Sequence, residues 1–208
     1  MAGVHTGGVT LHVLLDRPEV VAPQLLGARL ISDVGGLRVV ARLTEVEAYA
    51  GVGEDPGSHA YRRMTARNAT MFGPPGHAYI YFTYGMHWCA NVVTGAEGSA
   101  SAVLLRAGEI IEGVDAARRR RPSARSDREL ARGPARLAAA LGLTGELDGS
   151  DLLAPSSVVR LLLPRHPDPV AAITPRTGVA GSGATTPWRF AADHPTVSPY
   201  RAASRRAT

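Results

Sequence analysis

Two glutamates and one arginine in this sequence have the types and spacing needed to activate a water molecule. In the predicted strand Leu37 to Tyr49, the odd-numbered side chains from Val39 onward would share one face, which turns from apolar to acidic at Glu45 and Glu47. A carboxylate at the polar end of an apolar strand can serve as a general base toward water. Arg106 also ends an apolar run, so it could orient the same water or hold the carboxylate ionised. These residues indicate hydrolysis.

A tyrosine-rich segment from Gly73 to Val93 offers aromatic surface. It is typical of a β-hairpin with a tight turn around Gly85. Tyr84 would lie at the tip, where a bulky ring has little core to pack against and suits insertion between stacked bases. Burial preference assigns three other side chains of the hairpin to the core: Tyr79, Ile80 and Phe82. With His59 nearby, the tyrosine rings could sandwich a flat substrate, which points to hydrolysis on an aromatic group such as a base.

The residue types leave some other functions open and exclude others. Glu45, Glu47, Asp55 and His59 could hold a metal ion, as in a metal-dependent nuclease, although their spacing is not diagnostic of any metal. The hairpin could also serve a DNA-damage binder without catalysis. A zinc deaminase needs a paired cysteine motif, which the single Cys89 excludes, and we expect Cys89 to pack within its strand. The glycine-rich run GVGEDPG lacks the lysine and the following helix of a phosphate loop.

Composition narrows the class of protein further. A chain of 208 residues fits one domain with a real core, and the net charge of +5 with a pI near 10.0 makes nucleic acid a candidate partner. All 23 basic residues are arginine. Without lysine, no side-chain amine can form a Schiff base with an opened sugar, so water or a carboxylate must be the nucleophile. One cysteine, no signal peptide and no membrane-length apolar run predict a cytoplasmic protein.

The arginines gather in two places along the chain. Arg62, Arg63 and Arg67 lie in a polar loop that spans residues 50–75, and we expect them to contact phosphates. A second run, Arg118 to Arg121, ends a predicted helix. That run could be a solvated helix end favoured by the helix dipole or a phosphate-binding site, and the sequence favours neither.

The elements that must position these residues indicate an α+β fold: a single domain with a curved, mainly antiparallel sheet, flanking helices and a protruding hairpin. Asp16 and Pro18 predict a helix to about Leu26. The capping-box spacing of Ser126 and Glu129 predicts another, interrupted at Gly133-Pro134 and ending at Gly142. The remaining predicted elements are strands at 9–14, 29–33 and 102–107 (Arg106 at its end), a helix at 114–121, and short strands with proline-rich turns after 142. Residues 1–14 and 201–208 are expected to be flexible.

Several ordered segments resemble the alkyladenine (3-methyladenine) DNA glycosylase family. They are LLGARLI, TEVEAYAG, the stretch from His59 through MTARNATMFGPPGHAYIYFTYGMHWCANVV, VLLRAGEIIEG and DRELARGPARLAAALGL. The resemblance covers about residues 20–142 and, more weakly, 175–190. It implies a monofunctional enzyme, acting as a monomer without a metal or other cofactor. Such an enzyme cleaves the N-glycosidic bond of damaged purines in double-stranded DNA and leaves an abasic site.

The resemblance also implies roles for individual residues. Glu47 matches the general base and Arg106 the residue that holds the attacking water with it. The base pocket would be lined by Tyr49, His59 and Tyr81, with Asn91 disfavouring the exocyclic amino group of normal guanine. Tyr84 would wedge into the base stack, with Met86 beside it. Glu45 has no role implied by the family.

Overall fold

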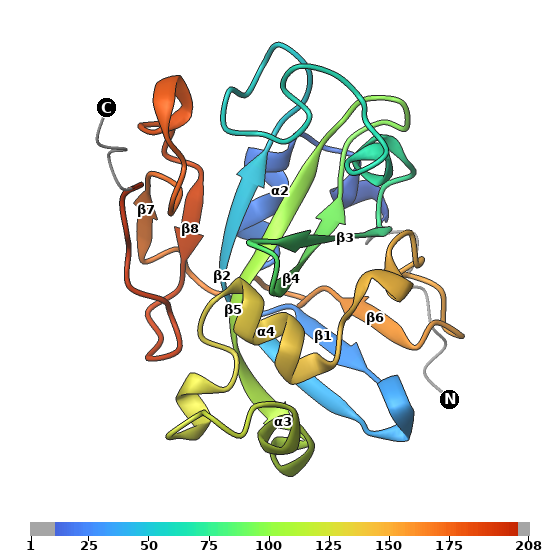
Figure 1. Cartoon of the computed structure of the whole chain (residues 1–208), viewed down its shortest axis with the longest axis vertical. Helices are drawn as coiled ribbons and strands as arrows, with labels where there is room; N and C mark the ends of the chain where they lie inside the picture. Colours follow the sequence, from blue (N-terminus) through green and yellow to red (C-terminus); the bar gives the residue numbers. More distant parts are fainter. Residues whose placement is uncertain (1–10, 204–208) are drawn as a thin grey trace.

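The computed structural model describes residues 11–203 and folds them around one twisted antiparallel sheet (Figure 1). Six strands run in the order β3-β4-β5-β2-β1-β6, and β8 joins β2 and carries β7. Every strand pair in the described residues is antiparallel. The strands are β1 Arg29–Ser32, β2 Val39–Tyr49, β3 Ala78–Thr83, β4 His87–Val93, β5 Ala102–Glu112, β6 Val159–Leu162, β7 Ala172–Thr174 and β8 Arg189–Ala191.

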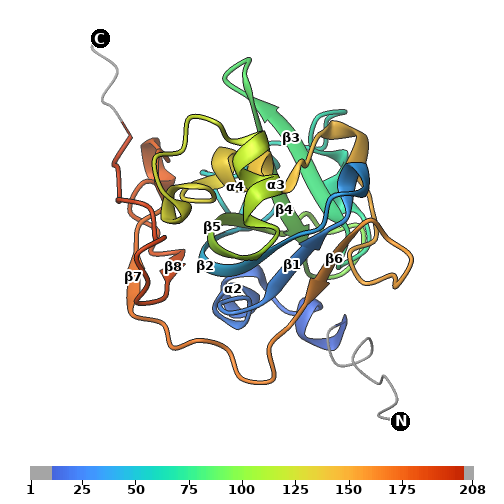
Figure 2. The same cartoon turned by 90° about the horizontal axis from the view of Figure 1, so that it is seen from below.

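Short helices cover both faces of the sheet. Helix α2 (Pro18–Gln24) packs on β2 from one side, and α4 (Pro134–Leu141) packs on β4 and β5 from the other, next to α3 (Val114–Arg120) (Figure 2). Helix α4 ends where predicted, because Gly142 takes a left-handed conformation with φ of 71° and donates to the last carbonyls. Single 3₁₀ turns lie in the connections: Val34–Gly36, Ala69–Phe72, Asp127–Glu129, Gly145–Leu147 and Gly181–Gly183.

Strand β2 changes its neighbour halfway along. Strand β5 pairs with β2 over nearly its whole length, so the other edge is shared by β1 at the beginning and β8 at the end. The pairing with β5 shifts register between Leu43 and Val46, at the change from β1 to β8. A β-bulge therefore lies at the centre of the strand.

This bulge decides which side chains of β2 reach the site. Ala41 and Leu43 belong to the core before the bulge, and Val46 and Ala48 belong to it afterwards. The extra residue inverts the alternation, because side chains repeat every two residues along a strand. The predicted common face from Val39 to Tyr49 is therefore wrong: the carboxylates leave the core face at the bulge, and not because the strand runs out of the core.

The β3–β4 hairpin forms as predicted and projects from the body of the molecule (Figure 2). Its turn has Tyr84 at φ 52° and Gly85 at φ 66°, and the Met86 N–H donates to the Thr83 carbonyl at 3.2 Å. Two successive positive φ angles match the twist of paired strands, but only glycine adopts them without strain. Tyr84 is the one non-glycine residue with positive φ among residues 11–203.

Four other predictions about elements need correction. Residues 11–14 are helical where a strand was predicted, and positions 9 and 10 lie outside the described residues. Strand β5 extends to Glu112, so Arg106 lies within the strand and not at its end. Ser126 opens only one 3₁₀ turn, because the chain must reset at Gly133 before α4 begins. Phe82 is 45% exposed instead of buried, since it shares the face of Ile80 but lies next to the turn of the projecting hairpin, beyond the core.

The α+β fold and its mainly antiparallel sheet are confirmed. Across residues 11–203, no helix is both long enough and apolar enough to cross a membrane.

Candidate active site

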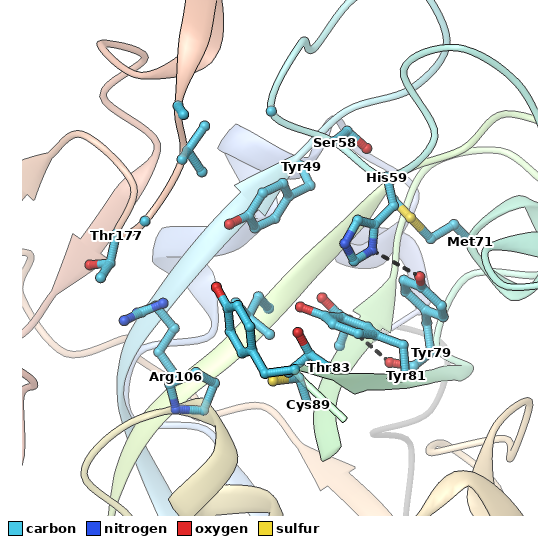
Figure 3. Close-up of a pocket in the computed structure, with 18 of the residues that line it drawn as sticks. Tyr49, Ser58, His59, Met71, Tyr79, Tyr81, Thr83, Cys89, Arg106 and Thr177 are labelled. Atoms are coloured by element: carbon cyan, nitrogen blue, oxygen red, sulfur yellow. Dashed lines mark hydrogen bonds between the residues drawn. The ribbon is translucent and has the colours of Figure 1, made fainter. Parts of the chain in front are cut away.

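A cavity of about 330 Å³ opens between the hairpin, the loop after β2 and the segment before β8 (Figure 3). The volume lies in the range of small-molecule sites. Strands β3, β4 and β5 form its floor, the loop carrying His59 forms one wall, and residues 177–180 form the opposite wall. The cavity brings together these predicted site residues: Tyr49, His59, Tyr81, Tyr84, Asn91 and Arg106.

Glu47 lies directly behind this cavity and is fully buried. Its Oε2 accepts hydrogen bonds from Tyr49 Oη at 2.9 Å and from Arg106 Nη1 at 3.1 Å. Its Oε1 accepts one from the Thr177 backbone N–H at 2.6 Å. A carboxylate offers about four lone-pair positions, so three donors leave one acceptor position, on Oε1. All three donors line the cavity, which places the carboxylate one layer behind its surface.

The surroundings of Glu47 make its carboxyl group a weaker acid, and so its carboxylate a stronger base, than usual. Burial raises the pKa of Glu47 above its usual 4.5, against the opposing charge of Arg106, and the neighbouring Glu45 acts in the same direction as burial. Burial and the Glu47 charge also raise the pKa of Tyr49 well above 10, so its hydroxyl remains a donor. Groups with such perturbed acidity gather at functional sites.

Arg106 bridges the two glutamates of β2. Its Nε donates to Glu45 Oε1 at 2.7 Å, while Nη1 donates to Glu47. Arg106 is almost completely buried, at 6% exposure, and still reaches the cavity. Two buried carboxylates thus share one cation, and Glu45 Oε1 also accepts from Arg189 Nε at 2.7 Å.

His59 and the two hairpin tyrosines form the aromatic wall (Figure 3). His59 Nδ1 lies 3.2 Å from Tyr79 Oη, and the His59 ring meets the Tyr81 ring edge-on at 4.6 Å between centroids. Burial, then the charge of Arg67, lowers the pKa of His59 below its usual 6.5, so the imidazole is neutral at pH 7. The buried Asn91 donates from Nδ2 to the Tyr79 carbonyl, which fixes its amide at the cavity floor.

A buried ion pair holds the two walls of the cavity together. Arg176 is fully buried and donates to both oxygens of Asp55, with its Nη2 at 2.6 Å from Oδ1. Asp55 also accepts from the backbone N–H groups of Ala50 and Gly57, so it orders the loop that carries His59. The Arg176 guanidinium stacks 4.6 Å from the centre of the Tyr49 ring.

This ion pair also removes a ligand from the metal-site alternative. Asp55 is paired with Arg176, Glu45 with two arginines, and His59 with Tyr79. Within residues 11–203, no three His, Cys, Asp or Glu side chains come together as a metal site would require. The residue geometry therefore does not support the nuclease alternative.

The hairpin tip stands at the rim of the cavity. Tyr84 lines the cavity and is nevertheless 83% exposed, and Met86 beside it is 66% exposed. Arg62 and Arg63 are exposed on the neighbouring loop. Arg67 lies 5.6 Å from the Tyr81 ring centre and donates to the Phe82 carbonyl, so it borders the cavity from the hairpin side.

The arginine run after β5 divides into different environments. Arg118 pairs with Asp127, and Arg120 donates to the carbonyls of Ala140 and Val34. Arg121 instead lines a second cavity, of about 340 Å³, with His87 next to the hairpin turn and Arg136 of α4. Burial, then the charge of Arg136, lowers the pKa of Arg121, and in the described chain its buried Nε has no hydrogen-bond partner. Two arginines and one carboxylate, Glu129, line this cavity, so its net charge is positive.

Three residues of the site were not predicted from the sequence. Thr177 acts through its backbone N–H, which any residue carries, and its only signal was the weaker resemblance at 175–190. Tyr79 was assigned to the core, and it is buried, but its hydroxyl contacts His59 in the cavity wall. Arg176 lies in the same weaker resemblance, but its pairing with Asp55 had no local signal, because the two residues are 121 positions apart.

A buried carboxyl group of raised pKa behind an aromatic cavity, on a basic α+β fold, is typical of a class of enzyme that hydrolyses a bond to a flat aromatic group. The sequence profile of the methylpurine-DNA glycosylase family matches residues 12–195. A Streptomyces avermitilis protein, whose name assigns it as a 3-methyladenine DNA glycosylase, is 59% identical over 189 residues, covering 89% of this chain and 88% of its own. Relatives with the same assigned name are 55% identical in Leifsonia xyli (87% of each chain) and 48% identical in Nocardia farcinica (95% and 93%).

The chain belongs to the methylpurine-DNA glycosylase family. It is therefore a hydrolase of the DNA glycosylase type, and its substrate is DNA.

Proposed function

We propose that this protein rotates alkylated or deaminated purines out of double-stranded DNA and hydrolyses their N-glycosidic bond with a water activated by Glu47. The observation that carries the proposal is the state of Glu47: buried, with a raised pKa, and with one acceptor position left on Oε1 beside Thr177. A water bound at that position would donate one proton to Glu47. Its oxygen would attack C1′ as the bond to the base breaks and the electron pair leaves with the base.

Arg106 and Tyr49 keep this carboxylate ready to accept the proton. Both donate to Oε2, so they fix the plane of the carboxylate and direct its remaining basicity to Oε1. The positive charge of Arg106 also keeps the ionised form accessible in a buried setting that would otherwise favour the neutral acid. The residues thus orient the base while leaving it basic enough to act.

The aromatic wall accounts for the choice of substrate. A purine alkylated at N3 or N7 carries a positive charge, and each contact of a cation with a tyrosine face contributes roughly 0.5–2 kcal/mol. The same charge makes the base a good leaving group. For a neutral lesion such as hypoxanthine, the neutral His59 is in the wall to supply a hydrogen bond to the base. Asn91 on the floor would disfavour the exocyclic amino group of normal guanine.

Tyr84 supplies the means of extracting the base. Rotating a base out of the stack costs a few kcal/mol, and a ring that fills the gap offsets part of that cost. The left-handed backbone at Tyr84 is a conformation that costs a bulky residue about 1 kcal/mol or more, and such strain is retained at sites where it serves a function. Here it presents the ring to solvent beside the cavity.

Sequence-independent affinity would come from arginines around the cavity. Arg62 and Arg63, exposed on the loop after β2, and Arg121 with Arg136, at the second cavity, would contact phosphates. The protein would act as a monomer in the cytoplasm and leave an intact strand with an abasic site. A lyase step through an internal lysine is excluded because the chain contains none.

A gel assay tests the proposal. Duplex oligonucleotides with hypoxanthine, ethenoadenine or a methylated purine are incubated with the protein in EDTA and then treated with alkali. We expect strand breaks at the lesion only after alkali, and no internal residue trapped by borohydride. Breaks without alkali, or activity that EDTA abolishes, would contradict the proposal.

A further inference from the structure

Glu45 is a fully buried carboxylate that the proposed chemistry does not use. Its Oε1 accepts from Arg106 Nε and Arg189 Nε, both at 2.7 Å, and from Ser198 Oγ at 2.8 Å. Its Oε2 accepts from the Ser198 backbone N–H at 2.6 Å. A buried charge with four donors is uncommon as a mere packing residue, because removing it from water is costly unless it is satisfied.

The donors of Glu45 come from distant parts of the chain. Arg106 lies on β5, Arg189 on β8, and Ser198 on the C-terminal segment that follows β8. The same segment is held to β2 by a contact between Thr44 and Thr196, and to the turn before α4 by Arg132, which donates to the Val197 carbonyl. The C-terminal segment is therefore anchored at two further places beside its contacts with Glu45.

This network fixes the orientation of one guanidinium. Arg106 has five N–H donors in one plane. Because Nε donates to Glu45, it is Nη1 that donates to Glu47, while Nη2 lies 3.5 Å from Ser198 Oγ. Without Glu45, only the long contact with Ser198 Oγ would oppose rotation of this plane, and Arg106 could form a two-pronged pair with Glu47 instead.

We propose that Glu45 is a positioning residue, which holds Arg106 through Nε so that the arginine makes one contact with Glu47, and that Arg189 and Ser198 hold Glu45 for this purpose. The inference rests on the proposed function of Glu47. A two-pronged Arg106 pair would occupy the acceptor position on Oε1 that the attacking water needs. Glu45 thus protects the basicity of Glu47 without touching the substrate.

The balance of charge supports the same role. Burial would raise the pKa of Glu45, but Arg106 and Arg189 outweigh it and lower that pKa below 4.5. Glu45 therefore remains ionised while Glu47 is the weaker acid of the two. Other titratable groups that face Glu47 are Tyr49, Tyr81 and Cys89, and burial raises the pKa of all three, so they stay neutral near pH 7.

Single-turnover release of hypoxanthine from a duplex, measured against pH, tests the role of Glu45. We expect Glu45→Gln to slow release about 10-fold to 100-fold at neutral pH, the scale of a misplaced active-site group. Duplex affinity should stay the same. The acid limb of the profile should move to lower pH, because removing the like charge of Glu45 and adding a second Arg106 hydrogen bond both favour ionised Glu47. Glu112→Gln, an exposed carboxylate on β5, is the matched control and should match the wild type.

A second readout does not depend on activity. The Arg106 Nε–H proton should give a downfield, slowly exchanging NMR signal in the wild-type protein, assigned by its disappearance in Arg106→Lys. Glu47→Gln should keep that signal while losing activity, since Nε contacts only Glu45. Glu45→Gln should move it upfield and speed its exchange. Ser198→Ala removes one donor to Glu45 and should show both effects in weaker form if Glu45→Gln fails to fold.

The outcomes separate the two proposals. If the wild type releases base and Glu45→Gln has an unchanged rate, profile and Arg106 signal, the positioning role is wrong and the proposed function stands. The same holds if Glu45→Gln unfolds and Ser198→Ala changes neither readout. If the wild type releases no base from any lesion, the proposed function fails and this inference fails with it.

Discussion

At the scale of single residues, Glu47 has the features of a base that must be both oriented and reactive. Its three donors fix its plane, and burial raises its pKa. We expect Glu47→Gln to keep binding a lesion duplex but to lower base release by at least ~10²-fold, the usual loss for a general base. Single-turnover kinetics beside a binding titration measure the two effects. Near wild-type release would assign the base role to another group.

The raised pKa of Glu47 also predicts the pH dependence of the wild-type enzyme. The base must be ionised, so the rate should fall as pH drops through the pKa of Glu47, and this limb should lie above the usual value of 4.5. A neutral lesion such as hypoxanthine is the cleaner substrate, because its own protonation state changes less over this range. A rate that is flat down to pH 4.5 would contradict the raised pKa.

At the scale of elements, the β3–β4 hairpin lets the role of its turn in stability be tested apart from the proposed role of the Tyr84 ring in base flipping. Tyr84 is exposed and strained, so Tyr84→Ala should change the free energy of unfolding by less than about 1 kcal/mol. Tyr84→Gly should even stabilise the fold, because glycine accepts positive φ without strain. Both should impair flipping, and less so where the lesion lies in a mismatch.

Thermal melting together with 2-aminopurine fluorescence beside the lesion measures these effects. A large drop in melting temperature with a defect that is the same in every duplex context would mean that Tyr84 supports the fold and is not a wedge. Tyr84→Phe is the matched control, since it keeps the ring and should keep the flipping signal.

The conformation of the loop after β2 depends on the buried ion pair between Asp55 and Arg176. Asp55→Asn would leave a fully buried arginine without its counter-charge, which costs about 3–5 kcal/mol in such pairs. Denaturant unfolding measures this loss, and Asp33→Asn, in a partly exposed ion pair with Arg38, should show a smaller one. Equal losses in the two variants would mean that the buried pair contributes no more to the free energy of unfolding than the partly exposed pair.

At the scale of the whole molecule, the distribution of arginine should set the affinity for undamaged DNA. Replacing Arg121 and Arg136 by alanine, or Arg62 and Arg63, should reduce the log–log salt slope by about 0.9 for each phosphate that the variant no longer neutralises. Arg165 is an exposed control in the loop between β6 and β7, which lies opposite the hairpin tip in Figure 2. If the control and the test pairs behave alike, the DNA face lies elsewhere.

The sequence by itself determined the local elements and predicted the main residues of the candidate site. Hydrophobic alternation, the glycines at 85 and 142 and the ordered motifs predicted the two hairpins, α4 and a site around Glu47, Tyr81 and Arg106, because each signal lies within a few adjacent residues. Helix and turn chemistry is local, so it can be recognised without the fold.

Only the tertiary structure decided how these residues contact each other. The bulge in β2 depends on its exchange of β1 for β8, and that exchange brings Glu45 and Glu47 out of the core face. Thr177, Arg176 and Ser198 reach the glutamates or their loop from more than 120 positions away. Buried charges must find partners wherever the chain folds them together, and neither the partner nor the resulting pKa of Glu47 is encoded in any local pattern.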